Sequence, residues 1–525
     1  MASPRRIRNC TSDTAGSLVW RVLRVRRAQP LRLASRSAAY GTGSRSGKKW
    51  LPDWRILWLM GGWMMVDPPF ASHLNPPNHQ PTMLHSARFR HRRGVTLFST
   101  VCAALCCAST SLYAAEPHAH QSGDTAWLLT STALVLFMMI PGLALFYAGL
   151  VRSKNVLSIF MQCFALTAVM SLVWLVCGYS LSFTGDSGFF GGLEKAFLKG
   201  VTPASSYAAY PNIPEPLWFA YQMMFFLITP GLFIGAFAER MKFSAIMVFS
   251  IFWSLLVYVP TCWGVWHKMD FFGLKNVIDL AGGIVVHITA GVAALVACIM
   301  VGPRKGFPGT QMMPHNLPFT VAGAGLLWVG WFGFNGGRQV AANGSAALTL
   351  VVTHLSASAA CVVWSVIEKI KVGKPSALGI ATGSIAGLAA ITPASGKVGP
   401  VGAICIGSVS ALVCWFFCAK VKQKFKYDDS LDVFGVHGVG GFIGTVLVAV
   451  FASPIFGGLG YAEGMTMGSQ LTTQLLASVY TILLSGVVSV ILLKVIDATI
   501  GLRVDGDEEN QGLDLSEHGE SGYNS

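Results

Sequence analysis

The chain has 525 residues, of which 53% are hydrophobic and only 12% are charged, so its composition lies outside the range of soluble globular proteins. The formal net charge of +14 arises at the N-terminus, where the first 93 residues contain 17 Lys and Arg against 3 acidic residues. The rest of the chain has 21 of each kind, so the charge indicates no nucleic-acid partner.

Twelve cysteines are spread along the chain, and none forms a Cys-x-x-Cys pair or a Cys/His ligand spacing. We interpret them as buried thiols, without a disulfide framework or a metal site. No cofactor is therefore expected.

Two segments precede the predicted membrane domain. Residues 83–115 contain four arginines, an apolar stretch and then small residues, which is typical of a bacterial secretory signal peptide cleaved near Ala114 or Ala115. Such a signal would leave the mature N-terminus outside. Residues 1–82 are rich in Arg and Ser, and their short apolar run cannot span a membrane. We interpret them as a non-native or mis-annotated extension, with a transit peptide as the alternative.

Eleven later stretches have the roughly 20 mostly apolar residues that a membrane-spanning helix needs. They are 126–150, 156–181, 215–238, 243–263, 279–301, 316–335, 343–368, 375–394, 398–419, 431–453 and 468–500. The last is longer than a membrane requires, so we expect it to tilt or to project into the cytoplasm. The spans form one domain over 126–500, and a polar tail follows at 501–525.

The Lys and Arg of the loops predict the orientation. With the mature N-terminus outside, thirteen fall in cytoplasmic loops: Arg152, Lys154, Arg240, Lys242, Arg304, Lys305, Lys369, Lys371, Lys374, Lys420, Lys422, Lys424 and Lys426. Six fall outside: Lys195, Lys199, Lys268, Lys275, Arg338 and Lys397. The positive-inside rule therefore places the C-terminus in the cytoplasm. We expect a multi-pass protein in the lipid of the cell (inner) membrane.

Two sets of five spans predict an inverted repeat. An odd number of spans in each set reverses the orientation of the second set, so the fold class is an all-α polytopic membrane protein with a 5+5 inverted repeat plus a long eleventh helix. The functional site of such a fold lies between the halves. The fifth and tenth spans then correspond, and each has a histidine after an aspartate: Asp279 with His287, and Asp432 with His437.

His287 and His437 are ionisable groups at membrane depth, where such groups usually mark a site or a pathway. A lone histidine in an apolar span is more often a hydrogen-bonding group between helices, but two at repeat-related positions favour a shared role. If the rings meet, each neutral imidazole can offer one nitrogen to the other and turn the second toward a lumen. Close helix packing is sufficient to explain most of the surrounding glycines.

Aromatic residues recur on two predicted helix faces. Tyr221 and Phe225 are four residues apart, and Trp331 and Phe334 are three apart. Each pair alone is more often core packing or part of an interfacial belt, as is Trp266 at the outer end of the fourth span. Together they could form an external vestibule that binds a small cation, with Phe225 and Phe334 closing the path beneath it.

Asp279 has a simpler structural explanation. At the start of the fifth span it is expected to be a buried N-cap whose carboxylate accepts backbone N–H groups. It could also bias a nearby cation site electrostatically, without touching the substrate.

Seven segments in order resemble the ammonium transporter (Amt/Mep/Rh) family, and its bacterial Amt branch in particular. They are LVLFMMIPGLALFYAGLVRSKNVLS (134–158), GAFAERMKFSA (235–245), DLAGGIVVHI (279–288), PHNLPF (314–319), GWFGFNGG (330–337), DVFGVHGVGG (432–441) and YAEGMTMG (461–468). The resemblance runs from about Thr130 to the C-terminus. It implies eleven helices per chain, a homotrimer and conduction through each protomer separately.

The resemblance also implies roles for particular residues. His287 and His437 match the family's paired pore histidines, and Phe225 with Phe334 matches its stacked gate. Members of its outer ammonium-recruitment site match two aromatic residues and a supporting acid here: Tyr221, Trp266 and Asp279. The segment 501–524 matches the family's cytoplasmic regulatory tail, which can bind a PII-type protein; its polar composition alone would permit plain disorder.

One position at the expected substrate site departs from the family pattern. Where the family has a small hydroxyl residue that hydrogen-bonds ammonium, this chain has Arg338, in the sequence FNGGRQV. A permanent cation there should weaken the binding of another cation. Either Arg338 turns away to an acid or to solvent, or the protein is a weaker conductor, a sensor or a channel for something neutral.

We therefore expect an ammonium transporter or channel, and not an enzyme, with methylammonium as a further substrate. A bare cation in a dry channel costs many kcal/mol. NH4+ would bind at the vestibule, lose its proton below the gate and pass the histidines as NH3, with the proton either left behind or relayed separately. The alternatives are an ammonium sensor and a neutral-gas or solute channel of the Rh or aquaporin kind, although the two Asn-Pro-Ala boxes of an aquaporin are absent.

Overall fold

A computed structural model describes residues 120–186 and 188–523. The segments interpreted as a signal peptide and as a preceding extension lie outside the described residues, so both interpretations stay predictions. All described residues belong to one compact unit of the chain.

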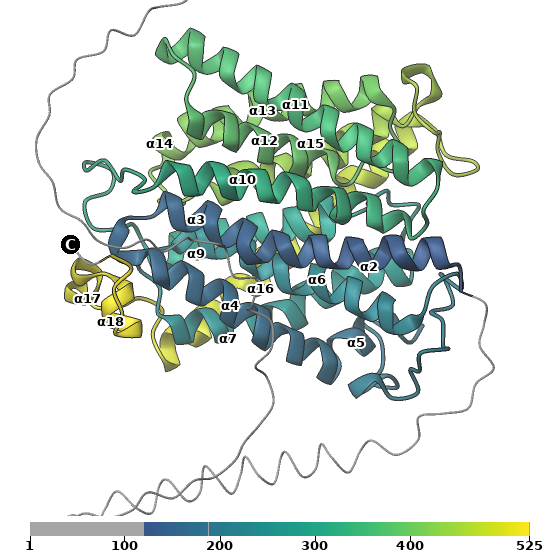
Figure 1. The fold of residues 1–525 in the computed structure, drawn as a ribbon, viewed down its shortest axis with the longest axis horizontal. Coiled ribbons are helices and arrows are strands. Elements are labelled where there is room, and N and C mark those ends of the chain that lie inside the picture. The colour runs from purple at the N-terminus through teal and green to yellow at the C-terminus, as the bar shows by residue number, and fades with distance from the viewer. Residues whose placement is uncertain (1–119, 187, 524–525) are drawn as a thin grey trace, which may run out of the picture. The chain divides into compact units, whose positions relative to one another are not determined.

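The described chain has ten helical stretches long and apolar enough to cross a membrane, and the shorter apolar helix α12 makes an eleventh. The predicted all-α polytopic fold is therefore confirmed. In order the helices are α2 (Ser122–Phe137) and α3 (Ala144–Leu150), α4 (Val156–Val173) and α5 (Tyr179–Phe183), α6 (Glu215–Phe233), α7 (Phe243–Trp253) and α8 (Val259–Cys262), α9 (Thr289–Val301), α10 (Leu317–Trp331), α11 (Gly344–Val372), α12 (Ala377–Ile391), α13 (Pro400–Phe416) and α14 (Lys422–Phe425), α15 (Val439–Phe451) and α16 (Met467–Thr499) (Figure 1). Four pairs each form one span across a π-helical turn: α2 with α3, α4 with α5, α7 with α8, and α13 with α14; α15 and α16 are separate spans.

Polar side chains set several helix starts. Asn343, Ser376 and Thr466 each accept a hydrogen bond from backbone N–H groups in the first turn of α11, α12 and α16. These N–H groups have no partner within the helix, so a side-chain oxygen stabilises the first turn. Helix α11 ends at Gly373, whose φ of 92° continues the chain in the left-handed region that favours glycine.

The two ends of the helical bundle differ. The loops predicted to be cytoplasmic meet at the end that carries the tail helices α17 (Gly506–Gln511) and α18 (Leu513–His518), on the left of Figure 1. We call this the inner end and the opposite end the outer end. The outer end carries the only strands of the described chain, the hairpin β1 (Asp270–Phe271) and β2 (Leu274–Lys275).

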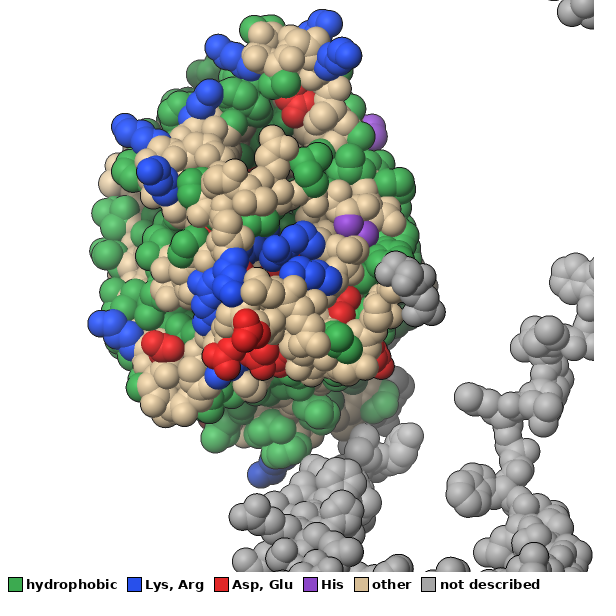
Figure 2. All heavy atoms as spheres, turned by 90° about the vertical axis from the view of Figure 1, so that its left-hand side faces the viewer, with side chains coloured by type: hydrophobic (Ala, Val, Ile, Leu, Met, Phe, Trp, Pro, Cys, Tyr) green, Lys and Arg blue, Asp and Glu red, His purple; other side chains and the backbone are tan. Residues whose placement is uncertain are grey.

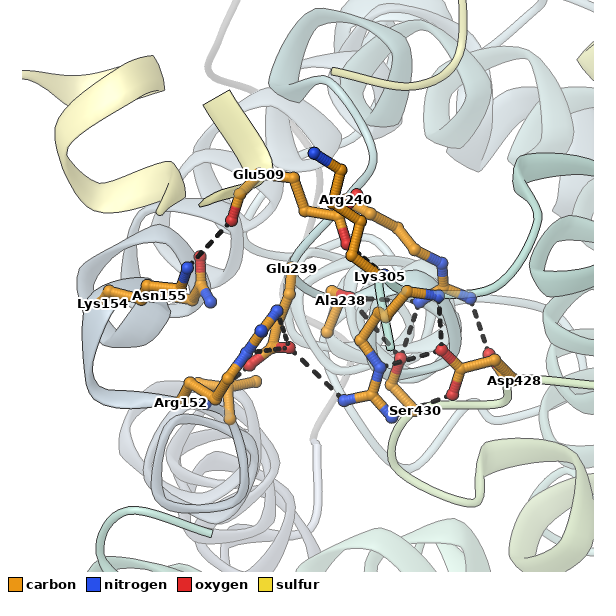
Figure 3. Close-up of polar contacts among 12 residues, drawn as sticks. Arg152, Lys154, Asn155, Ala238, Glu239, Arg240, Lys305, Asp428, Ser430 and Glu509 are labelled. Atoms are coloured by element: carbon orange, nitrogen blue, oxygen red, sulfur yellow. Dashed lines mark hydrogen bonds and ion pairs between the residues drawn. The ribbon is translucent and has the colours of Figure 1, made fainter. Parts of the chain in front are cut away.

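Buried ion pairs join the loops at the inner end. Figure 2 shows Lys and Arg side chains gathered beside acidic ones on this face. Arg304 donates to Asp428 at 2.8 Å and lies 3.4 Å from Glu239. Glu239 also pairs with Arg152 at 2.8 Å (Figure 3). Burial alone would raise the pKa of Asp428, but the hydrogen bonds and charge of Arg304 outweigh it and hold that pKa below its usual value. These contacts fix the loops to one another.

The tail is folded against the same end. The buried Glu509 carboxylate accepts from the backbone N–H of Lys305 and from the Arg503 guanidinium, both at 2.7 Å. Lys154 donates to the Glu509 carbonyl at 3.0 Å (Figure 3), and Asp514 accepts from the N–H of Ser158 at 2.7 Å. Plain disorder, which the composition would have permitted, is therefore excluded for the described part of the tail.

Candidate functional site

The two intramembrane histidines meet in the middle of the fold. Nδ1 of His287 lies 3.2 Å from Nδ1 of His437, and the rings are nearly parallel, with centroids 5.2 Å apart. Both side chains are buried, with 1% and 3% exposure. Nε2 of His287 has no hydrogen-bond partner among the described residues. Since one ring must donate and the other accept across the shared contact, at most one of the two can be protonated at that nitrogen.

Each histidine lies in a π-helical turn just before a membrane helix. His287 lies in Gly283–Ile288, which continues into α9, and the preceding Gly282 has a φ of 114°. The Asp279 carboxylate accepts from four successive N–H groups, those of residues 282–285, at 2.6–3.1 Å. The predicted capping role of Asp279 is confirmed, and the cap holds the turn that carries His287.

The second half of the repeat has the same arrangement with a different acid than expected. His437 lies in the π-helical turn Phe434–Gly438, and the Asp429 carboxylate accepts from the N–H groups of Val433 and Phe434 at 3.0 and 2.7 Å. Asp432, taken from the sequence as the counterpart of Asp279, instead forms an ion pair with Lys422. Asp279 and Asp429 both stand eight residues before their histidines, a spacing that would have identified the pair from sequence.

Phe225 and Phe334 lie against each other above the histidines. Their ring centroids are 4.3 Å apart, and Phe334 is 6.2 Å from the His287 ring. Both are buried. Tyr221, one helical turn from Phe225, donates its hydroxyl hydrogen to the carbonyl of Gly333 or of Phe334, at 2.9 and 3.0 Å. This bond fixes α6 to the segment that carries Phe334.

Trp331 and Trp266 lie on opposite sides of this phenylalanine pair. Trp331 stacks on His287 with centroids 5.7 Å apart and donates from Nε1 to Thr392 at 2.8 Å. Trp266 packs edge-on to Phe225 at 5.7 Å and donates to the Asp279 carbonyl at 2.9 Å. Of the two tryptophans predicted for a vestibule, Trp266 lines a cavity at the outer end, whereas Trp331 lies beside the histidines.

Three cavities are lined by residues of this site or by their neighbours. An outer cavity of about 380 Å³ is lined by Trp266, Asp279 and Arg338 among others. A narrow space of about 10 Å³, room for about one water-sized molecule, is lined by His287, His437 and mostly apolar side chains. An inner cavity of about 320 Å³ also reaches His437. The imidazole pair therefore lies next to a small apolar space that borders the inner cavity.

Arg338 does not turn away to an acid or to solvent. Its side chain is buried, and none of the ion pairs in the described chain involves it. Nη1 donates to the Tyr210 hydroxyl at 3.0 Å. The guanidinium carbon lies 4.9 Å from the centroid of Trp266, 5.2 Å from that of Trp218 and 5.9 Å from that of Tyr210. The guanidinium therefore lies among three aromatic rings beside the outer cavity.

Sequence reasoning missed two members of this aromatic group. Trp218 precedes Tyr221 by three residues and Phe225 by seven, so helical spacing places it on the same face and could have identified it. Tyr210 lies in the loop before α6, where no periodicity indicates its direction. Its contact with Arg338 depends on the tertiary fold.

Fold and cavities together define a polytopic helical membrane protein with a buried imidazole pair. The model of the Ammonium Transporter Family matches residues 126–523. An ammonium transporter of Aquifex aeolicus is 44% identical over 420 residues, covering 79% of this chain and 96% of that protein. One of Bacillus subtilis is 42% identical over 406 residues, covering 77% and 99%. The chain belongs to the ammonium transporter family, and it is a transport protein and not an enzyme.

Solved structures agree with this assignment. A protein described as "Sensor Amt Protein" superposes with a TM-score of 0.70 at 29% identity, covering 75% of this chain and 98% of its own. Mep2 of Candida albicans superposes with a TM-score of 0.68 at 31% identity, covering 74% and 88%. The fold is thus similar both to Mep2 and to a protein named as a sensor.

Proposed function

We propose that this protein conducts ammonium nitrogen across the membrane as neutral NH3. NH4+ gathers at the outer cavity and gives up its proton near Phe225 and Phe334. The proton either stays behind with the water of the outer side or is relayed separately, and the remaining NH3 crosses past His287 and His437. The observation that carries the proposal is the contact of the two imidazoles beside the narrow apolar space. It gives an otherwise apolar path one pair of polar groups, with which a neutral molecule can form hydrogen bonds.

Desolvation is the physical reason for a neutral species. The narrow space offers no carboxylate to balance a cation, and an unpaired charge in such surroundings costs many kcal/mol. Ammonia has no charge and can both donate and accept hydrogen bonds. Potassium, which has no proton to lose, would have to cross as a cation. Selection then rests on proton chemistry and does not require a size filter.

An ammonium sensor is the second candidate function. Two observations favour it: Arg338 lies among the vestibule's aromatic rings, and the "Sensor Amt Protein" has a similar fold. A sensor would change the contacts of the docked tail on binding ammonium without passing it through the membrane.

Flux measurements separate the two functions. Purified protein in proteoliposomes should take up ammonium and methylammonium faster than empty vesicles, and the chain should rescue growth on low ammonium in a host lacking its own transporters. Ammonium-dependent exposure of the tail to protease, without flux, would contradict conduction and support sensing.

Four further expectations stay predictions: the homotrimer, a PII-type partner at the tail, the inner-membrane location and an external N-terminus. Size measurement in detergent, tail pull-down and accessibility labelling would test them.

A further inference from the structure

The outer cavity holds a charged group that the proposed conduction does not use. Arg338 is 6% exposed, its Nε has no hydrogen-bond partner, and no carboxylate of the described chain pairs with it. The nearest acid lining the cavity, Asp279, directs both carboxylate oxygens to backbone N–H groups. A buried guanidinium of this kind needs another source of stabilisation.

Aromatic rings supply that stabilisation. The guanidinium carbon lies within 6 Å of the centroids of Trp266, Trp218 and Tyr210, the distance at which a cation is attracted to the face of a ring. The Tyr210 hydroxyl accepts a hydrogen bond from Nη1 and fixes the side chain in place. Arg338 thus makes the contacts that an ammonium ion would need at this site.

We propose that Arg338 is a tethered cation that occupies the outer aromatic site and competes with ammonium for it. This inference rests on the proposed function in one respect, namely that ammonium is gathered at the outer cavity. Ammonium must displace the guanidinium or bind beside it, and two cations a few ångströms apart repel each other in a partly buried site. Arg338 is therefore an affinity-determining residue that weakens cation binding without blocking neutral ammonia.

The test is a titration with ammonium chloride at constant ionic strength, read by the fluorescence of the tryptophans around the site. Arg338→Met keeps a flexible unbranched side chain but removes the guanidinium and its charge, and Arg338→Ser opens the site. In both variants the half-maximal ammonium concentration should fall at least tenfold, which corresponds to about 1.4 kcal/mol. Tyr210→Phe keeps the ring but frees Nη1, so a smaller fall is expected.

Lys275→Met is the matched control. It removes a positive charge from the exposed β2 strand at the same end without touching the aromatic rings, so its half-maximal concentration should equal that of the unmodified protein. An unchanged or higher value in Arg338→Met would overturn the proposal. If that variant does not fold, an unchanged value in Tyr210→Phe would do the same.

Parallel proteoliposome uptake distinguishes this inference from the proposed function. If the binding midpoint falls in the variants while no form transports ammonium, conduction is wrong and the tethered cation stands. If the unmodified protein transports ammonium and the midpoint does not move in the variants, conduction stands and the tethered cation is wrong.

Discussion

The Asp279 carboxylate is the best-bonded acid near the site, with four backbone N–H donors and 6% exposure. Asp279→Asn would place an amide NH2 group, which is a donor, against backbone N–H groups that are also donors. We expect a loss of about 1–3 kcal/mol of stability and slower uptake, because the turn that carries His287 is no longer held. Thermal unfolding in detergent and proteoliposome uptake would measure the two effects.

Asp186→Asn is the control for this change. Among the described residues, the Asp186 side chain has one long ion-pair contact, 3.6 Å to Lys268, and it is 92% exposed. Neither unfolding temperature nor uptake should change in this variant. Equal effects at the two positions would contradict the importance of the buried cap.

At the scale of elements, the histidines meet because the two segments that carry them pack closely against each other at glycine residues. A Cβ atom built on Gly291 would lie 2.2 Å from Cα of Gly438, and one on Gly441 would lie 2.7 Å from Cβ of His287. Gly291 belongs to α9, and Gly438 and Gly441 lie at and just after the turn that carries His437. Their small size sets the spacing of the two histidine-bearing segments.

Gly291→Ala should therefore push these segments apart. Overpacking of this kind typically costs about 1–3 kcal/mol, and the separation of the imidazoles should also reduce uptake. Gly325→Ala is the matched control, because Gly325 lies exposed in α10 with nothing within 4 Å of a built Cβ. That variant should be neutral or slightly more stable. Comparison of unfolding temperature and uptake would show the difference, and identical behaviour would refute the packing role.

At the scale of the whole molecule, the tail is joined to the bundle through Glu509. Glu509→Gln keeps the shape but weakens the charge-assisted bonds from Lys305 N–H and Arg503. We expect about 1–3 kcal/mol less docking free energy and faster cleavage of residues 504–523 in limited proteolysis. Asp507→Asn, an exposed change in the same helix, should leave the cleavage rate unaltered. A tail that is equally protected in both variants would argue against docking through Glu509.

Much of this architecture could be predicted from sequence, because membrane helices are determined by long apolar runs and basic loops, which are local properties. The eleven helices followed from apolar length, and the capping role of Asp279 from its position at the start of a span. Repeat symmetry favoured a shared role for His287 and His437 and raised the possibility that their rings meet. Asp432 was misassigned because only the order of residues was compared between the repeats, whereas the spacing of eight residues selects Asp429.

The direction of Arg338 could not be predicted in the same way. The sequence left two possibilities: either Arg338 turns to an acid or to solvent, or the protein has an altered function. The structure places the guanidinium among aromatic rings from three different segments. Tyr210 comes from a loop, Trp218 from α6 and Trp266 from the end of the fourth span, so no local pattern brings them together. The folded tail likewise depends on contacts more than 200 residues apart in sequence.

The central claim is that a neutral molecule passes two facing imidazoles, and the doubly substituted protein His287→Leu, His437→Leu tests it most directly. Ammonium uptake and potassium uptake would be measured in proteoliposomes, after unfolding temperature has shown that the variant is folded. We predict that ammonium uptake falls at least tenfold, or that its selectivity over potassium is lost. Unchanged uptake with unchanged selectivity would contradict the account and make both histidines structural.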